Sequence, residues 1–130
     1  MPITPVANNS IGDMDRSTLL WTWVLTTATP DGLGIEMPEW ADRTWTAFET
    51  GDVAGGATTI RVQGSNNNVD WFNCINAATT VAIDLFAAGV GSIATPVENP
   101  RFMRPLLSNV GAGASITVRA CLRRINTMRT

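Results

Sequence analysis

The side chains that usually perform catalysis near neutral pH are largely missing from this chain. His and Tyr do not occur, and all nine basic residues are Arg, so Lys is absent too. A nucleophilic Ser or Cys needs a neighbouring base, most often His or Lys. Paired carboxylates could act as they do in glycosidases, but Asp42, Glu49, Asp52 and Asp70 show no spacing that singles out a pair. We therefore expect a protein that is not an enzyme.

Metal and cofactor motifs are equally weak. Cys74 and Cys121 form no CxxC or Cys/His pattern, which argues against zinc and redox chemistry and predicts two free thiols. The Gly-rich stretch 51–56 lacks the GxxxxGK[ST] continuation of a phosphate-binding loop. Oxygen ligands for calcium occur at 31–32 and 66–70, although ordinary turn residues explain them better. We expect no cofactor and no bound metal.

The overall charge disfavours nucleic acid as a partner. The formal net charge is −2 and the pI is about 4.9, whereas domains that neutralise phosphate are strongly basic. Residues 1–65 carry eight acids and three Arg, and residues 66–130 carry three acids and six Arg, giving balances of −5 and +3. This asymmetry could support head-to-tail self-association, although a solvated surface is the simpler explanation.

No targeting segment is recognisable in the sequence. The N-terminal residues 1–6 lack a basic region followed by an apolar stretch, and the apolar runs are shorter than the roughly 18 residues of a membrane helix. We expect synthesis in a reducing cytosol and no membrane partner.

The chain divides into three parts. Residues 1–18 combine two early prolines with polar residues and show no periodicity, which predicts an extended N-terminal arm. Residues 19–125 form the predicted folded domain, and 126–130 form a C-terminal tail. At 130 residues the chain is long enough for one well-packed core.

Within the domain, apolar residues alternate with polar ones, and no segment has helical periodicity. Leu19, Trp21, Trp23 and Leu25 share one face of the first predicted strand, and the strongest local signal is a hairpin around the turn 64–68. The strands are predicted at 19–26, 42–49, 58–63, 70–75, 79–86, 101–107 and 115–123, with an eighth possible at 92–97 and a turn at 29–34. This pattern predicts an all-β fold, an antiparallel β-sandwich or jelly roll of about eight strands.

The five Trp divide into two groups by position. Trp21 and Trp23 lie on the inward face of the first strand and are predicted to pack in the core. Trp40, Trp45 and Trp71 lie near predicted loops and could be exposed, although core packing is expected for at least three of the five. Exposed aromatic side chains near sandwich loops can stack on sugars or anchor a protein interface.

Arginine gathers in the C-terminal part of the chain, in or just after the last two predicted strands. Arg is enriched in protein interfaces because its planar fork makes bidentate contacts and its stem covers apolar surface. Arg119, Cys121 and Arg123 share the outward face of the final strand and would form a basic stripe. A solvated outer face explains these residues equally well; the full set is Arg101, Arg104, Arg119, Arg123 and Arg124.

Two stretches carry a family resemblance. Residues 62–71, V-Q-G-S-N-N-N-V-D-W, resemble a V-Q-G-S-N-D-G-x-N-W hairpin, and residues 99–105, N-P-R-F-M-R-P, resemble an N-P-R-[FY]-[IVM]-R-P strand. Both motifs resemble those of jelly-roll virion proteins of tailed bacteriophages that decorate or cement the head, and more loosely those of discoidin-like, galactose-binding-like modules. The resemblance covers about residues 40–124. It departs at Asn67 and Asn68, where Asp-Gly is usual in the sugar modules.

The resemblance implies a structural protein of a phage particle. It would be made in the host cytoplasm, bind the major capsid protein on the outer surface of the head, and bridge neighbouring subunits, itself as a homo-oligomer, a dimer or a trimer. Contacts to the capsid or to another subunit are expected from Ile3, Pro5 and Val6 of the arm and from the five C-terminal Arg.

Two alternatives stay open. One is a carbohydrate-binding module that uses Trp71 or Trp40 as a stacking platform. The other is a tail or adaptor component of a virion, since one fold can serve several positions in a particle.

Overall fold

The computed structural model of the protein describes residues 6–7, 18–26, 30–37, 40–49, 58–87, 91–108 and 115–124. In these segments all regular structure is β, and they contain no helix long and apolar enough to cross a membrane. The strands are β1 (Val6–Ala7), β2 (Thr18–Thr26), β3 (Ile35–Glu36), β4 (Trp40–Glu49), β5 (Thr59–Ser65), β6 (Phe72–Asn73), β7 (Ile93–Ala94), β8 (Phe102–Ser108) and β9 (Ser115–Arg124).

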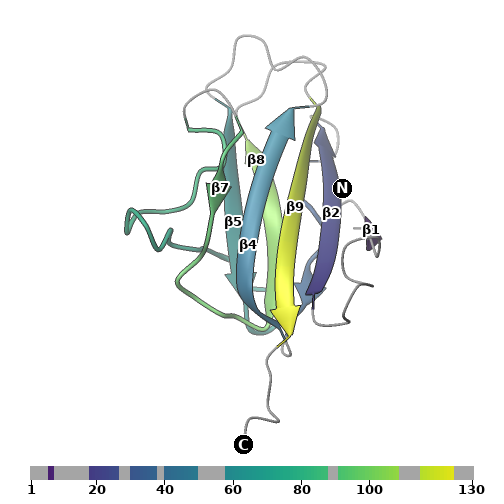
Figure 1. Ribbon diagram of the computed structural model, residues 1–130, viewed down its shortest axis with the longest axis vertical. Coiled ribbons are helices and arrows are strands. Elements are labelled where there is room, and N and C mark those ends of the chain that lie inside the picture. The colour runs from purple at the N-terminus through teal and green to yellow at the C-terminus, as the bar shows by residue number, and fades with distance from the viewer. Residues whose placement is uncertain are drawn as a thin grey trace, which may run out of the picture.

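The strands form two antiparallel sheets that pack face to face (Figure 1). One sheet has the order β1-β2-β9-β4-β7 and the other β3-β8-β5-β6. Apart from the short β1, each sheet takes four strands, and the chain crosses repeatedly between the sheets, as in the double Greek key of a jelly roll. The predicted β-sandwich of jelly-roll type is therefore confirmed.

The core lies between the sheets and is filled from alternating positions. In β9 the inward residues Ile116, Val118, Ala120 and Leu122 are fully buried, as their spacing predicts. At the centre the ring of Trp23 stacks on that of Trp45, with 5.1 Å between the ring centroids and 17° between the planes. Trp45 is fully buried, so it packs in the core although its position near a predicted loop allowed exposure.

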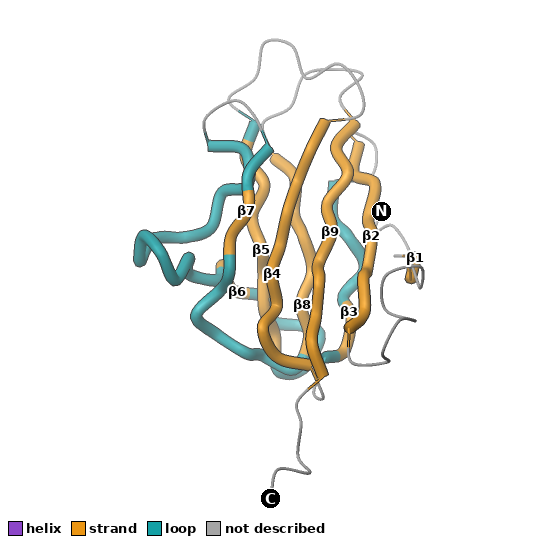
Figure 2. Tube along the Cα trace, in the orientation of Figure 1, coloured by secondary structure: helices purple, strands orange, loops and turns teal. Residues whose placement is uncertain are grey.

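Several features of the strand assignment differ from the prediction: the strand predicted at 70–75 is reduced to β6 and the possible strand at 92–97 to β7. Residues 79–86 do not form the predicted strand, because the chain turns at Asn76. The side-chain oxygen of Asn76 accepts a hydrogen bond from Ala78 N, and the backbone carbonyl of Asn76 accepts one from Thr80 N. Thr80 itself has a positive φ of 61°. This turn chemistry outweighs the β-branched pattern, and Ala82 retains only an isolated bridge to Ile75. The described loop residues between β6 and β7 run along one side of the sandwich (Figure 2).

The turn predicted at 29–34 lies instead alongside β8. Gly32 N donates to Pro105 O, Leu107 N donates to Pro30 O, and the chain continues into the edge strand β3. Gly32 is required there because an added Cβ would lie 2.6 Å from Trp23 Cδ1 and 2.7 Å from Pro105 Cδ. The sheet thereby gains an edge strand that sequence reasoning missed.

Candidate functional site

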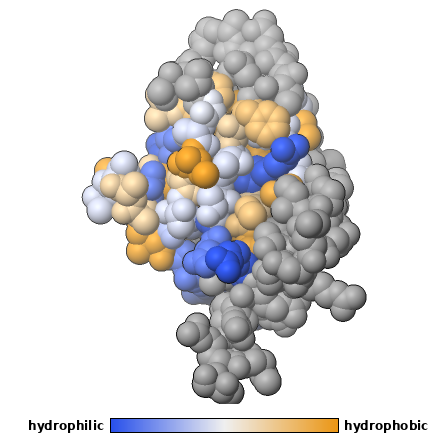
Figure 3. Space-filling view, in the orientation of Figure 1, coloured by the Kyte–Doolittle hydropathy of each residue, from blue (hydrophilic) through white to orange (hydrophobic). Residues whose placement is uncertain are grey.

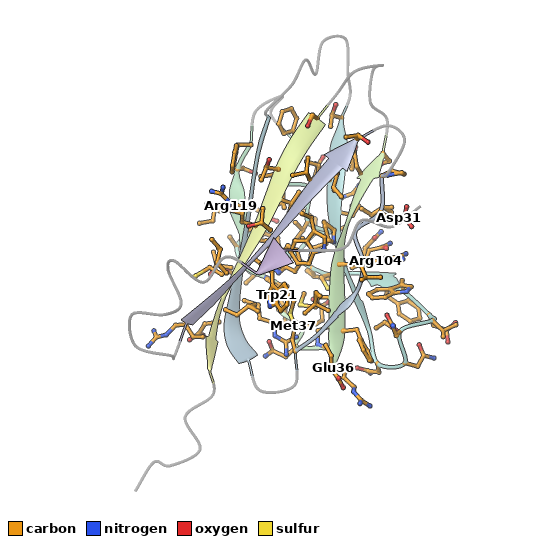
Figure 4. The ribbon with its side chains drawn as sticks, turned by 90° about the vertical axis from the view of Figure 1, so that its right-hand side faces the viewer. Trp21, Asp31, Glu36, Met37, Arg104 and Arg119 are labelled. Carbon is orange, nitrogen blue, oxygen red and sulfur yellow. The ribbon has the colours of Figure 1, made fainter. Side chains whose placement is uncertain are left out.

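The jelly-roll topology separates the C-terminal Arg residues. Arg119 and Arg123 lie on the outer face of the five-stranded sheet, whereas Arg104 belongs to β8 of the four-stranded sheet and Arg101 directly precedes that strand. Figure 4 places Arg119 and Arg104 on opposite sides of the sandwich. The five Arg therefore do not form a single patch.

The outer face of the five-stranded sheet exposes large apolar side chains around Arg119. Val24, Phe48 and Ile93 are 44%, 38% and 66% exposed. Figure 3 looks onto this sheet, and orange hydrophobic side chains reach the surface there among paler ones. The guanidinium carbon of Arg119 lies 4.9 Å from the centroid of the Phe48 ring, which holds both side chains in a cation–π contact.

Strand register places these residues next to one another. Val24 and Phe48 both lie opposite Thr117, which puts them on either side of β9 in one row. In the adjacent row Thr46 lies opposite both Arg119 and Ile93. We call Val24, Phe48, Ile93 and Arg119, with the Thr between them, the outer patch. Aromatic and Arg side chains are enriched in protein interfaces.

Arg104 lies in a cluster on the opposite face. Its guanidinium carbon is 4.3 Å from the centroid of the Trp71 ring, and its Nε donates to Gln63 Oε1 at 3.0 Å. Burial lowers the pKa of Arg104, and the charge of Asp31 partly opposes that shift. Trp71 also packs on Gly34, where an added Cβ would lie 2.7 Å from Trp71 Cη2. The indole is thus a half-buried packing element, with one ring face covered by Arg104.

Arg101 is exposed and forms an ion pair with Glu36 of β3. Its guanidinium carbon also lies 5.3 Å from the Phe102 ring centroid. An exposed pair of this kind contributes little to stability. The ion pair connects the start of β8 to the edge strand β3.

The remaining predicted contact residues are only partly described. Val6 belongs to β1 and pairs with Thr22 at the edge of β2, so this part of the arm adds a strand to the sheet. Ile3 and Pro5 lie outside the described residues. Arg124 ends β9, with its backbone opposite Trp40. Arg123 is exposed and lies opposite Thr18.

Arg43 is a structural residue that sequence reasoning missed. Its side chain is 3% exposed, and its guanidinium donates to the carbonyls of Pro100 and Met37. A bulge in β4 at this point, with Asp42 at φ 50°, turns the Arg into the interior. Burial lowers the pKa of Arg43, and the neighbouring Cys74 opposes that shift. Arg43 thereby fixes the segment that leads into the N-P-R-F-M-R-P strand.

The two motif stretches lie side by side, since β5 and β8 are paired from Thr59↔Ser108 to Ser65↔Phe102. At their ends, Arg101 N donates to Asn66 Oδ1. Pro100 packs directly against Gly64, so no larger residue fits at that position. The segments before β8 and after β5 form the two walls of a cleft.

The oxygen-bearing side chains at 66–70, considered from the sequence as calcium ligands and interpreted as turn residues, form hydrogen bonds within the turn. Asn67 Oδ1 accepts from Val69 N, Asp70 N and Ser65 Oγ, and Asn67 Nδ2 donates to Asp70 Oδ2. Within the described part of the chain, no group of three or more His, Cys, Asp or Glu side chains is arranged to hold a metal ion. Both cysteines are free, as expected.

Comparisons with known protein families, with curated proteins and with solved structures find no significant match to this chain.

Proposed function

We propose that this protein is a structural component of a bacteriophage virion that binds the outer surface of the head shell and bridges neighbouring capsid subunits. The outer patch is the observation that carries this proposal. A flat sheet face with three exposed large apolar side chains and a positioned Arg favours contact with another protein. The resemblance of the two motifs to those of phage virion proteins supports the choice of a phage particle, and the jelly-roll fold is compatible with it.

The partner of the outer patch is the major capsid protein. The patch carries Arg119 as its charged centre, so a complementary capsid surface has an apolar depression beside a carboxylate or backbone carbonyls. The rigid pairing of Arg119 with Phe48 lowers the entropy lost on binding, because neither side chain needs to be ordered at that moment.

Bridging stabilises the shell through binding alone, without bond chemistry. A protein that binds only the closed arrangement of subunits stabilises it by RT ln(1 + [L]/Kd), or about 2.7 kcal/mol at a hundredfold excess over Kd. Self-association as a dimer or trimer adds avidity because several copies bind one symmetric shell. In this proposal the arm lies along the shell or a neighbouring subunit, and the protein assembles onto heads in the host cytoplasm.

Co-sedimentation with purified head shells tests this proposal. Wild-type protein is expected to sediment with shells, and Phe48→Glu to lose at least about tenfold in affinity because it places a carboxylate in an apolar contact. Val69→Glu is the matched control, since Val69 is exposed in the β5–β6 turn, away from the outer patch. Binding to isolated tails and not to shells would assign the protein to the tail, and equal binding by both variants would remove the outer patch from the proposal.

A further inference from the structure

A cleft of about 580 Å³ opens beside the edge of the four-stranded sheet, away from the outer patch. Its volume is within the range of about 300–1,000 Å³ typical of small-ligand sites. The cleft lies between the turn that follows β5 and the segment that leads into β8. It is lined by Gly64, Ser65, Asn66, Asn67, Asp70, Phe72, Asn73, Cys74, Glu98, Asn99 and Pro100.

Hydrogen bonds hold both walls of the cleft in place. On one wall, Asn67 closes the turn through its side-chain bonds to Val69 N and Asp70 N. On the other wall, Glu98 Oε1 accepts from Ile75 N, while the buried Arg43 binds the Pro100 carbonyl. A ligand would therefore meet a preformed site and would not have to order it.

The chemistry of the lining is neutral to acidic and rich in amides. Asn66 and Asn99 can each donate and accept, and Asp70 and Glu98 can accept. The residues that line the cleft include no Arg, which disfavours phosphorylated and other anionic ligands. Groups that donate and accept side by side match the vicinal hydroxyls of a sugar ring.

Phe72 gives the cleft an apolar edge. It lies opposite Gly64 on the short edge strand β6, on the inward side of the sheet, yet it is 71% exposed. The side chain of its neighbour Asn73 lies on the other face of the strand, where Asn73 Oδ1 accepts from Gln63 Nε2. An exposed aromatic ring at the rim of a cleft that also carries amides can pack on the C–H face of a pyranose while the amides bind its hydroxyls.

From this arrangement we propose that the cleft between the β5–β6 turn and the segment 98–100 is a binding site for a neutral saccharide. Phe72 is the stacking residue, and Asn66 and Asn99 bind hydroxyl groups. Trp71, the platform considered from sequence, is instead engaged with Arg104 and Gly34. The inference is independent of the proposed function, because the cleft and the outer patch share no residue.

Chemical-shift titration of the ¹⁵N-labelled full-length protein tests the site. The probes are methyl β-D-galactoside, methyl α-D-glucoside and N-acetyl-D-glucosamine, each raised into the millimolar range. We expect at least one sugar to shift the side-chain amide signals of Asn66 and Asn99 in a saturable way. If none of the three sugars shifts these signals, the proposal is overturned.

Phe72→Ala is the diagnostic variant, because an exposed side chain can be removed without disturbing the core. It is expected to weaken sugar binding roughly tenfold. Val69→Ala is the control, since Val69 is equally exposed in the same turn but does not line the cleft. Equal affinities of Phe72→Ala and wild type would contradict the assignment. Phe48→Glu is expected to lose shell binding but to bind the sugar with wild-type affinity. Shell binding and sugar binding are therefore measured independently, and either proposal can fail while the other holds.

Discussion

The guanidinium of Arg104 lies over the indole ring of Trp71, 4.3 Å from its centroid, and so joins the strand of one motif to the loop of the other. These residues are 33 positions apart in the sequence. The contact covers the ring that could otherwise serve as an exposed stacking surface. Because of this contact, the solvent accessibility of Trp71 reports whether the β5–β6 turn is ordered.

Arg104→Gln is expected to lower the free energy of unfolding by about 1 kcal/mol, because the cation–π contact with Trp71 is lost. Urea unfolding measures this change, and acrylamide quenching of fluorescence should report a more accessible Trp71. Arg123→Gln is the matched control, since its exposed side chain lies on the other sheet and should contribute less than about 0.5 kcal/mol. A smaller loss in Arg104→Gln than in the control would refute the role of the contact.

Gly34→Ala is expected to destabilise the protein by about 1–3 kcal/mol. The new methyl group would lie 2.7 Å from both Trp71 Cη2 and Asn68 Oδ1, so one of the two must move. A double-mutant cycle with Trp71→Ala measures the coupling. If Gly34→Ala costs the same in the Trp71→Ala background as in the wild type, Trp71 is not the cause.

Arg43→Met should cost about 3 kcal/mol of stability, because it leaves the buried carbonyl of Met37 and the half-buried carbonyl of Pro100 without their donor. Thermal or urea unfolding gives the value directly. Arg123→Met is the control, because its exposed side chain predicts a change within about 0.5 kcal/mol. Similar small effects in both variants would mean that water replaces the guanidinium without cost.

High pH should destabilise the fold through Cys74. Burial, assisted by the charge of Glu98 and opposed by that of Arg43, raises the pKa of this thiol from 9.0 to about 12. Between these two values the unfolded chain ionises while the folded protein keeps its proton, so stability falls as pH rises through that window. Well below pH 9 the thiol is protonated in both the folded and the unfolded state, so its contribution to stability does not change with pH.

The test compares the pH dependence of unfolding in wild type and Cys74→Ala between pH 8 and 11. The variant is expected to lose stability less steeply above the ordinary thiol pKa of 9.0, whatever its absolute stability. Parallel curves for the two proteins would contradict the raised pKa. Alkylation with iodoacetamide offers an independent check, because the buried thiol should react only after unfolding.

Local hydropathy patterns were sufficient to predict the strands that have one buried and one exposed face. Apolar residues alternate with polar ones in β5 and β9, and Ile60, Val62 and the inward residues of β9 are buried, because a buried face imposes a period of two on nearby residues. The strand predicted at 79–86 failed because the turn at Asn76 is encoded in side-chain hydrogen bonds, which hydropathy does not detect. The edge strand β3 was missed because its partner β8 lies far along the chain.

The candidate sites depended more on topology than on local pattern. That Arg119 and Arg104 lie on opposite faces follows from β8 and β9 joining different sheets, which sequence spacing does not reveal. The outer patch needs the alignment of β2, β9, β4 and β7, and the cleft needs two segments about 30 residues apart. Only the outward position of Arg119 and Arg123 on β9 could be predicted from the sequence.

Heat-induced release of packaged DNA from heads tests the central claim most directly. Heads that lack this protein would be reconstituted with the wild type, with Phe48→Glu or with the control Val69→Glu, and DNA release would be followed by dye fluorescence during heating. The account predicts that the wild type and Val69→Glu raise the release temperature and that Phe48→Glu does not. A release temperature that the wild-type protein leaves unchanged, even at saturating concentration, would contradict the account.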